Sequence, residues 1–276
     1  MVKLGVFDLD GTLLTSDGKL PETFYQDVEL LRSRGVSAAI ASARPAQFLF
    51  EMFDRDVDLL ISGEDGNIFF RGKQLLHVRY VPAGLIDRVY AITAGRDDTA
   101  VLCTGLNEIY VSAEHFRRFI EWGKGRFMPD APKDLNENAK VCKIHVLCRD
   151  GVEAAKRMIA SPDFAEIRSG CNMTESGYGW IGITAKDSNK AAAVRFFQKY
   201  LNIGNDETAV FGDSENDIPM FELTENSYAM KNAPADIRQK AKHVTEDDND
   251  HNGAMKALLS LTASNEIPAL TSNTCK

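Results

Sequence analysis

The sequence predicts an α/β protein whose core is a doubly wound, mostly parallel sheet and whose middle carries an inserted α+β domain. Two observations support this prediction: both ends of the chain alternate strand-length apolar runs with helical patterns, and the middle does not. Alternation of this kind is typical of a parallel sheet covered by helices. At the N-terminal end, the alternating segments are residues 3–8, 22–34, 36–41, 46–53 and 58–62.

Local signals support the two helices near the N-terminus. Phe24, Val28 and Leu31 recur at the spacing of one helical face, and Gly35 follows as a stop signal. Pro45 suits the first turn of a helix, because a helix start leaves that backbone N–H without an intrahelical partner in any case. Each helix therefore lies between two predicted strands.

The middle of the chain lacks this regular alternation of strands and helices. Two apolar runs flank Gly72 in the manner of a hairpin. Further strand candidates lie at residues 100–104, 109–111, 141–148, 164–168 and 179–185. Within residues 141–148, Cys142, Ile144, Val146 and Cys148 share one face, which suits a half-exposed sheet. We therefore expect an inserted α+β domain at residues 82–185.

The α/β rhythm returns after residue 187. The pattern predicts a helix at 188–200, a strand at 208–212, a short helix near 217–223 and a last helix near 252–261. Residues 1–81 and 186–276 are therefore expected to fold together as the core.

Composition favours a globular soluble protein, with 44% apolar and 26% charged residues. A net charge of -8 disfavours a nucleic-acid partner, which requires a basic surface. No apolar run approaches the length of a membrane span, and the start of the chain lacks a signal-peptide pattern. The five cysteines include no CxxC pair, so reduced thiols in a cytoplasmic protein are expected. The sequence predicts no particular oligomeric state.

Polar residues that can carry chemistry follow three of the predicted strands. They are Asp8 and Asp10 after the first strand, Ser42 after the second, and Asp213 with Asp217 after the strand at 208–212. Ligands of open α/β sheets bind outside the carboxyl ends of the strands, so these residues are expected to converge on one edge. Lys190, in the first turn of the helix at 188–200, could reach the same edge.

These residue types suit reactions of phosphate esters. Aspartate oxygens are hard ligands, which Mg²⁺ accepts together with water and substrate phosphate. A metal-held carboxylate stays ionised and can attack phosphorus, and a second carboxylate two residues on can transfer the proton. Ser42 and Lys190 can hold phosphate oxygens against the charge that builds during transfer. These residues are therefore expected to bind a phosphate group and to carry out its transfer.

The motifs resemble those of the haloacid dehalogenase (HAD) superfamily. Residues 8–12, Asp-Leu-Asp-Gly-Thr, resemble its DxDGT signature, and residues 212–217 resemble its GDxxND motif. Residues 41–44 and Lys190 resemble its second and third motifs, in the expected order. The resemblance implies a HAD-like, Rossmann-like core. Two positions depart from the family pattern, since Ala43 and Ala191 stand where glycine is common.

The resemblance also implies a role for each matching residue. Asp8 would be the nucleophile, and Asp10 the general acid and base with its backbone carbonyl at the metal. In full, the candidates are Asp8 and Asp10 for catalysis, Asp8, Asp10, Asp213 and Asp217 for Mg²⁺, and Ser42, Lys190, Thr12, Arg44 and Asn216 for the substrate phosphate.

The position of the insert indicates which branch of the superfamily the chain resembles. Only 31 residues separate Asp10 from Ser42, whereas 147 separate Ser42 from Lys190. A large cap between the second and third motifs resembles the Cof-type branch. Such enzymes act on small phosphorylated metabolites, often sugar phosphates and sometimes pyridoxal phosphate or flavin mononucleotide.

Other readings of the sequence remain open. The same fold would also suit a phosphotransferase or mutase, or a non-catalytic regulator that binds a phosphorylated metabolite. Residues 177–182 match the dinucleotide-binding pattern GxGxxG, but that site needs a helix next, and the following residues predict a strand. The GxGxxG match is therefore attributed to strand packing.

Overall fold

The computed structural model describes residues 1–53, 55, 58–82, 84–122, 129–136, 138–175 and 177–265. The chain divides into two compact units. Unit 1 contains Met1–Ile40 and Val194–Lys276, and unit 2 contains Ala41–Ala193. The predicted division into a core and an insert at 82–185 stays a prediction. Within the described ranges, no helix combines the length and apolarity that a membrane span requires.

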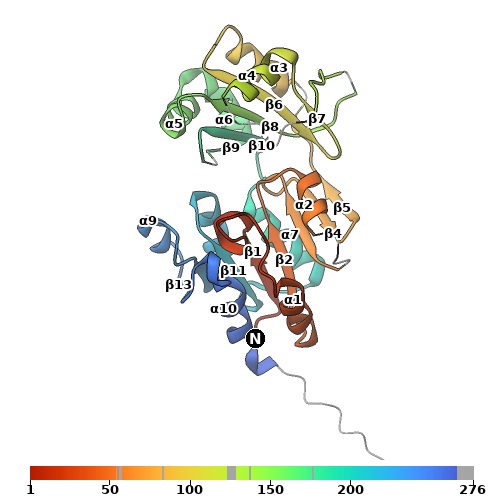
Figure 1. Ribbon diagram of the computed structural model, residues 1–276, viewed down its shortest axis with the longest axis vertical. Helices are drawn as coiled ribbons and strands as arrows, with labels where there is room; N and C mark the ends of the chain where they lie inside the picture. Colours follow the sequence, from red (N-terminus) through yellow and green to blue (C-terminus); the bar gives the residue numbers. More distant parts are fainter. Residues whose placement is uncertain are drawn as a thin grey trace, which may run out of the picture. The chain divides into compact units, whose positions relative to one another are not determined.

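The helices and strands follow the alternating order that the sequence predicts at both ends of the chain (Figure 1). Up to the first long strand of unit 2, the elements are β1 (Leu4–Phe7), η1 (Leu9–Leu13), α1 (Phe24–Ser33), β2 (Ser37–Ala41), α2 (Ala46–Met52), β3 (Leu60–Gly63), β4 (Ile68–Arg71), β5 (Gln74–Val78), α3 (Leu85–Thr93) and β6 (Thr99–Gly105). The rest of unit 2 contains β7 (Ile109–Tyr110), α4 (Ala113–Glu121), β8 (Val141–Cys148), α5 (Val152–Ala160), η3 (Pro162–Phe164), α6 (Ala165–Gly170), β9 (Cys171–Glu175), β10 (Trp180–Ala185) and the start of α7 (Lys190–Leu201). The chain then forms η4 (Asn205–Glu207), β11 (Thr208–Gly212), η5 (Glu215–Asp217), α8 (Ile218–Phe221), β12 (Asn226–Ala229), α9 (Ala235–Arg238), β13 (His243–Val244), η6 (Asn249–His251), α10 (Gly253–Leu261) and η7 (Ala263–Asn265).

The larger sheet has eight strands in the order β13-β12-β11-β1-β2-β3-β4-β5. Strands β13, β12, β11, β1 and β2 pair in parallel, whereas β3, β4 and β5 form antiparallel pairs. This arrangement confirms the predicted α/β fold with a mostly parallel sheet. The crossover order also brings β1 beside β11, so the carboxyl ends of two strands that are distant in sequence become neighbours.

Strands β1 and β11 form the buried centre of unit 1. Every residue of both strands is buried, as expected for parallel strands covered on both faces. The rings of Phe7 and Phe211 stack 5.0 Å apart across the pair. On another side of β1, a Cβ at Gly5 would collide with the Leu258 side chain of α10. Glycine at this position therefore lets α10 pack closely on the sheet.

The second sheet is antiparallel, with five strands in the order β7-β6-β8-β10-β9. All its strands belong to unit 2, and the sheet is consistent with the predicted cap. The prediction that β8 is half-exposed is wrong, because every residue of β8 except His145 is buried. Ile144 and Val146 pack into a cluster with residues of α3, α5 and α6, and Leu147 packs with Phe119 of α4. Both faces of the strand are therefore covered.

The prediction of a strand at residues 164–168 is also wrong. The chain there forms the short turn η3 and then α6, and the strand β9 follows only at Cys171. Pro162 suits the first position of a helical turn, and only Ile167 of α6 is buried. Residues 164–168 contain two buried apolar residues, Phe164 and Ile167, which is too few for their spacing to distinguish a strand from a short helix.

Candidate metal and phosphate site

Asp8 lies directly after β1 in the middle of the parallel sheet. Its backbone N–H donates to the carbonyl of Phe211 at 2.9 Å, which continues the pairing with β11 by one residue. The side chain is only 4% exposed. The chain then turns through η1, a single π-helical turn, in which Gly11 has a φ of 79°. A Cβ at Gly11 would collide with the carboxylate of Asp213, so the turn requires glycine on two counts.

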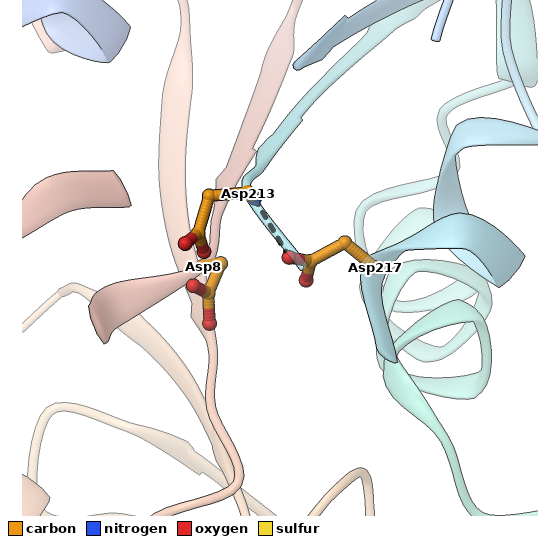
Figure 2. Close-up of side chains that lie close together, drawn as sticks. All are labelled: Asp8, Asp213 and Asp217. Atoms are coloured by element: carbon orange, nitrogen blue, oxygen red, sulfur yellow. Dashed lines mark hydrogen bonds between the residues drawn. The ribbon is translucent and has the colours of Figure 1, made fainter. Parts of the chain in front are cut away.

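Asp213 and Asp217 follow β11 in a capped turn. Oδ2 of Asp217 accepts a hydrogen bond from the backbone N–H of Asp213 at 2.8 Å (Figure 2). It accepts a second one from the backbone N–H of Ser214 at 3.0 Å. Asp217 is fully buried, and a Cβ at Gly212 would collide with it. Gly212 and Asp217 are therefore both needed to shape the loop that carries Asp213.

The carboxylates of Asp8, Asp213 and Asp217 converge. Each offers an oxygen that lies within 4.8 Å of the other two, and Figure 2 shows the three groups around a common space. Like charges at this separation repel, and a cation placed between them offsets the repulsion. Carboxylate oxygens are the hard ligands that Mg²⁺ and Ca²⁺ prefer. The donor set therefore fits a hard divalent cation.

The other predicted residues of unit 1 lie around this group. Asp10 is exposed and its side chain is not one of the three converging carboxylates. Its predicted metal contact was through the backbone carbonyl and stays a prediction. Thr12 is buried and donates through Oγ1 to Oδ1 of Asp213 at 3.4 Å. Asn216 accepts a hydrogen bond from the Ser214 hydroxyl at 2.8 Å.

Two asparagines that the sequence analysis left unassigned support the loop that follows Asp8. Asn232 donates through Nδ2 to the carbonyl of Gly11 at 2.8 Å. Asn249 donates to the carbonyl of Leu14 at 2.9 Å, and its backbone N–H donates to Oδ1 of Asn232. Only the Asn232 segment carries a sequence signal, because residues 229–233 resemble a stretch common in Cof-type proteins. Asn249 is recognisable from the fold alone.

Ser42, Arg44 and Lys190 belong to unit 2, where all three are buried. The Ser42 hydroxyl accepts a hydrogen bond from the backbone N–H of Arg44 at 3.1 Å. The Ser42 backbone is held by Ser62, whose carbonyl accepts its N–H at 2.9 Å. Lys190 begins α7, as predicted. The phosphate-binding roles of these residues stay predictions.

The arrangement of the three carboxylates is consistent with the family of proteins that the chain resembles. The model of one family, described as haloacid dehalogenase-like hydrolase, matches residues 6–258. The protein belongs to this family. The HMP-PP phosphatase of Cronobacter sakazakii is 24% identical over 255 residues, which cover 88% of this chain and 89% of that protein.

Solved structures give the same result for the fold. SMU.1108c from Streptococcus mutans UA159 is 25% identical, with a TM-score of 0.83 over 95% of this chain and 100% of that chain. The HAD subclass IIB sugar phosphatase BT4131 is 21% identical, with a TM-score of 0.76 over 94% of this chain and 99% of that chain. The predicted membership of the HAD superfamily, as a phosphatase of the Cof-type branch, is therefore confirmed.

Proposed function

We propose that this HAD-type protein is a Mg²⁺-dependent phosphatase that hydrolyses a small phosphorylated metabolite, with a sugar phosphate as the first candidate, through an aspartyl-phosphate on Asp8. The convergence of Asp8, Asp213 and Asp217 after two adjacent parallel strands is the observation that supports it. These carboxylates would hold Mg²⁺, with the carbonyl of Asp10 as a further ligand. When bound, Mg²⁺ offsets the negative charge of the phosphate and of the carboxylates.

The protein's own residues account for each step of the reaction. A carboxylate oxygen of Asp8 attacks phosphorus, the ester P–O bond breaks, and the leaving oxygen keeps the electron pair and takes a proton from Asp10. Water then attacks the aspartyl-phosphate and gives a proton to Asp10, which releases phosphate and restores Asp8. Asp10 is exposed, so it can exchange protons between turnovers. Ser42 and Lys190 would bind the phosphate oxygens, with Thr12, Arg44 and Asn216 as further contacts.

The first experiment measures phosphate release from a panel of phosphorylated compounds, with and without Mg²⁺. The panel contains hexose and pentose phosphates, pyridoxal phosphate, flavin mononucleotide and p-nitrophenyl phosphate. It also contains HMP-PP, because similar proteins are named for it. We expect Mg²⁺-dependent release that Asp8→Asn abolishes. The matched control Asp17→Asn changes an exposed aspartate that pairs with Lys19 and should leave the rate unchanged.

Two results would contradict the proposal. Release that survives in Asp8→Asn would exclude this nucleophile, and release that does not depend on a divalent metal would exclude the metal role. Transfer of the phosphoryl group to a second sugar hydroxyl, without free phosphate, would instead identify a phosphotransferase. Binding of a panel compound without turnover, seen as thermal stabilisation, would identify a regulator.

A further inference from the structure

A buried loop of unit 2, residues 64–67 between β3 and β4, adjoins Ser42 and the segment that leads into Lys190, two of the proposed phosphate-binding residues. The N–H of Asp65 donates to the carbonyl of Ser42 at 3.1 Å. At the other end of the loop, the Ser188 hydroxyl donates to Oδ1 of Asn67 at 2.7 Å, two residues before Lys190. The close approach continues at Gly66, where a Cβ would lie 2.5 Å from the carbonyl oxygen of Asn189. The loop is therefore fixed between the Ser42 turn and the start of α7.

The loop carries two acidic residues, and one of them is fully compensated. Asp65 accepts a hydrogen bond at 2.5 Å from Nζ of Lys143 in β8, and the two side chains are 5% and 2% exposed. Nζ of Lys143 also donates to the carbonyl of Ala43 at 3.1 Å. Burial alone would raise the pKa of Asp65, but the charge and hydrogen bond of Lys143, with the charge of Lys190, outweigh it and lower the pKa. Asp65 therefore stays ionised as part of an ion pair.

Glu64 is different, because its carboxylate is buried without such compensation. Its exposed fraction is 0%, and among the described residues neither oxygen has a hydrogen-bond partner. Nε2 of His145 lies 3.6 Å from Oε2 of Glu64, beyond hydrogen-bond range. Burial, supported by the charge of Lys143, lowers the pKa of His145 despite Glu64, so the imidazole is neutral near pH 7. A buried carboxylate without hydrogen-bond partners destabilises the folded protein.

The backbone adds to the cost of this arrangement. Glu64 and Asp65 both have a φ of 54°, a left-handed conformation that is unfavourable for residues with a side chain. Glu64 therefore combines a strained backbone with a buried carboxylate that lacks hydrogen-bond partners, and its loop contacts Ser42. Such a combination is typical of a position that is kept for a ligand rather than for stability.

The chemistry of Glu64 limits what that ligand offers. Carboxylate oxygens accept hydrogen bonds, and the two oxygens of Glu64 suit a pair of hydroxyl groups. The hydroxyl of Thr104 and Nε2 of His145, which lie 3.1 Å apart, are further polar atoms at the same place. Glu64 is a neighbour of the proposed phosphate-binding residues in the fold but is not one of them, so it is placed to contact a part of the substrate other than the phosphate.

We propose that Glu64 is a specificity residue that accepts hydrogen bonds from the hydroxyl groups of the substrate's leaving group. The proposal rests on the function proposed above, since it takes Ser42 and Lys190 as the phosphate-binding residues. Because Glu64 is fully buried, the side chains packed against it must shift for the substrate to reach it. Discrimination among substrates then depends on one carboxylate that the phosphate does not touch.

The test compares two substrates of the full-length protein with Mg²⁺. One is the sugar phosphate of the panel that the wild type hydrolyses fastest, and the other is p-nitrophenyl phosphate, which has no hydroxyl on its leaving group. In Glu64→Gln, kcat/KM for the sugar phosphate should fall by roughly 10- to 100-fold, as expected for a lost hydrogen bond to a charged group. For p-nitrophenyl phosphate, kcat/KM should stay within about threefold of the wild-type value, because the phosphate-binding residues are unchanged.

Three controls separate the possible outcomes. Glu121→Gln, at an exposed position of α4, should change neither substrate. The thermal midpoint of Glu64→Gln should equal or exceed that of the wild type, because the variant removes a buried charge. Inorganic phosphate should inhibit Glu64→Gln and the wild type equally.

A parallel loss on both substrates, or an unchanged ratio between them, overturns the specificity role of Glu64. A wild type that hydrolyses the aryl phosphate but no sugar phosphate also overturns it. In both cases the proposed phosphatase activity stands. Absence of turnover of every compound by the wild type overturns the proposed function itself, and the specificity role with it.

Discussion

Two clusters of charged side chains, one in each unit, differ in how their charges combine. In unit 1, Asp8, Asp213 and Asp217 bring three carboxylates within 4.8 Å of one another. In unit 2, Asp65 meets the opposite charge of Lys143 at 2.5 Å. Unit charges about 4 Å apart near a protein surface interact by about 4 kcal/mol, repulsively in the first cluster and attractively in the second. The first cluster therefore gains from an added cation, whereas the second is complete within the chain.

Removal of one carboxylate from the first cluster should have the largest effect. Asp213→Asn relieves repulsion, so without Mg²⁺ its free energy of unfolding should equal or exceed that of the wild type. With Mg²⁺ at about 100 times its dissociation constant, the wild type should gain about 2.7 kcal/mol and the variant far less. Phosphate release should fall by more than the roughly 10- to 100-fold that loss of a supporting residue costs. Urea unfolding and the phosphate assay, each with and without Mg²⁺, measure both effects.

Asp236→Asn is the matched control, because Asp236 is an exposed aspartate of α9 in the same unit. It should retain the full Mg²⁺-dependent stabilisation and the full activity. An Asp213→Asn variant that Mg²⁺ stabilises as strongly as the wild type would show that the three carboxylates do not form the metal site.

Disruption of the ion pair in unit 2 should act on stability in the opposite direction. Lys143→Met leaves Asp65 buried without its lysine, so the free energy of unfolding should fall by about 3–5 kcal/mol. The double variant Lys143→Met/Asp65→Leu removes both charges and should recover most of that loss. Urea unfolding of the wild type, the single variant and the double variant at neutral pH measures the difference.

Lys133→Met provides the comparison for an exposed pair. Lys133 and Glu108 form an ion pair with side chains that are 48% and 45% exposed, so its loss should cost less than about 1 kcal/mol. Equal destabilisation by Lys143→Met and by the double variant would mean that packing, not charge, accounts for the loss.

The two clusters also differ in how far the sequence predicts them. Asp8 and Asp213 are predictable because each follows a buried apolar run, and parallel strands bring their carboxyl ends to one edge. The pair formed by Asp65 and Lys143 joins residues 78 positions apart. No local pattern encodes such a pairing, so the sequence alone does not predict it.

The error on β8 has the same origin. Lys143 and His145 alternate with apolar residues, which predicts one exposed face. The structure covers that face, because Lys143 is buried against Asp65 and His145 lies beside Glu64. Alternation shows that a strand has two chemically different faces, but not whether solvent or another charged group meets the polar one. The predicted set of site residues accordingly left out Glu64, which has no motif.

The smallest expected effect concerns His145 of β8, which lies beside Glu64, and the pH dependence that it gives to the stability of the protein. Burial lowers its pKa from the ordinary value of 6.5, and the nearby charges of Lys143 and Glu64 act in opposite directions. Below pH 6.5 the unfolded chain therefore takes up a proton at this histidine more readily than the folded protein does, and stability falls as the pH drops. His145→Asn lacks this proton uptake, so its free energy of unfolding should fall less steeply between about pH 7 and about pH 5. Urea unfolding without Mg²⁺ measures the two slopes, with His243→Asn, at an exposed position, as the control.

A slope in His145→Asn that matches or exceeds that of the wild type would mean that His145 is charged in the folded protein. It would then compensate Glu64 as Lys143 compensates Asp65, and the contrast between the two acidic residues of the loop would disappear.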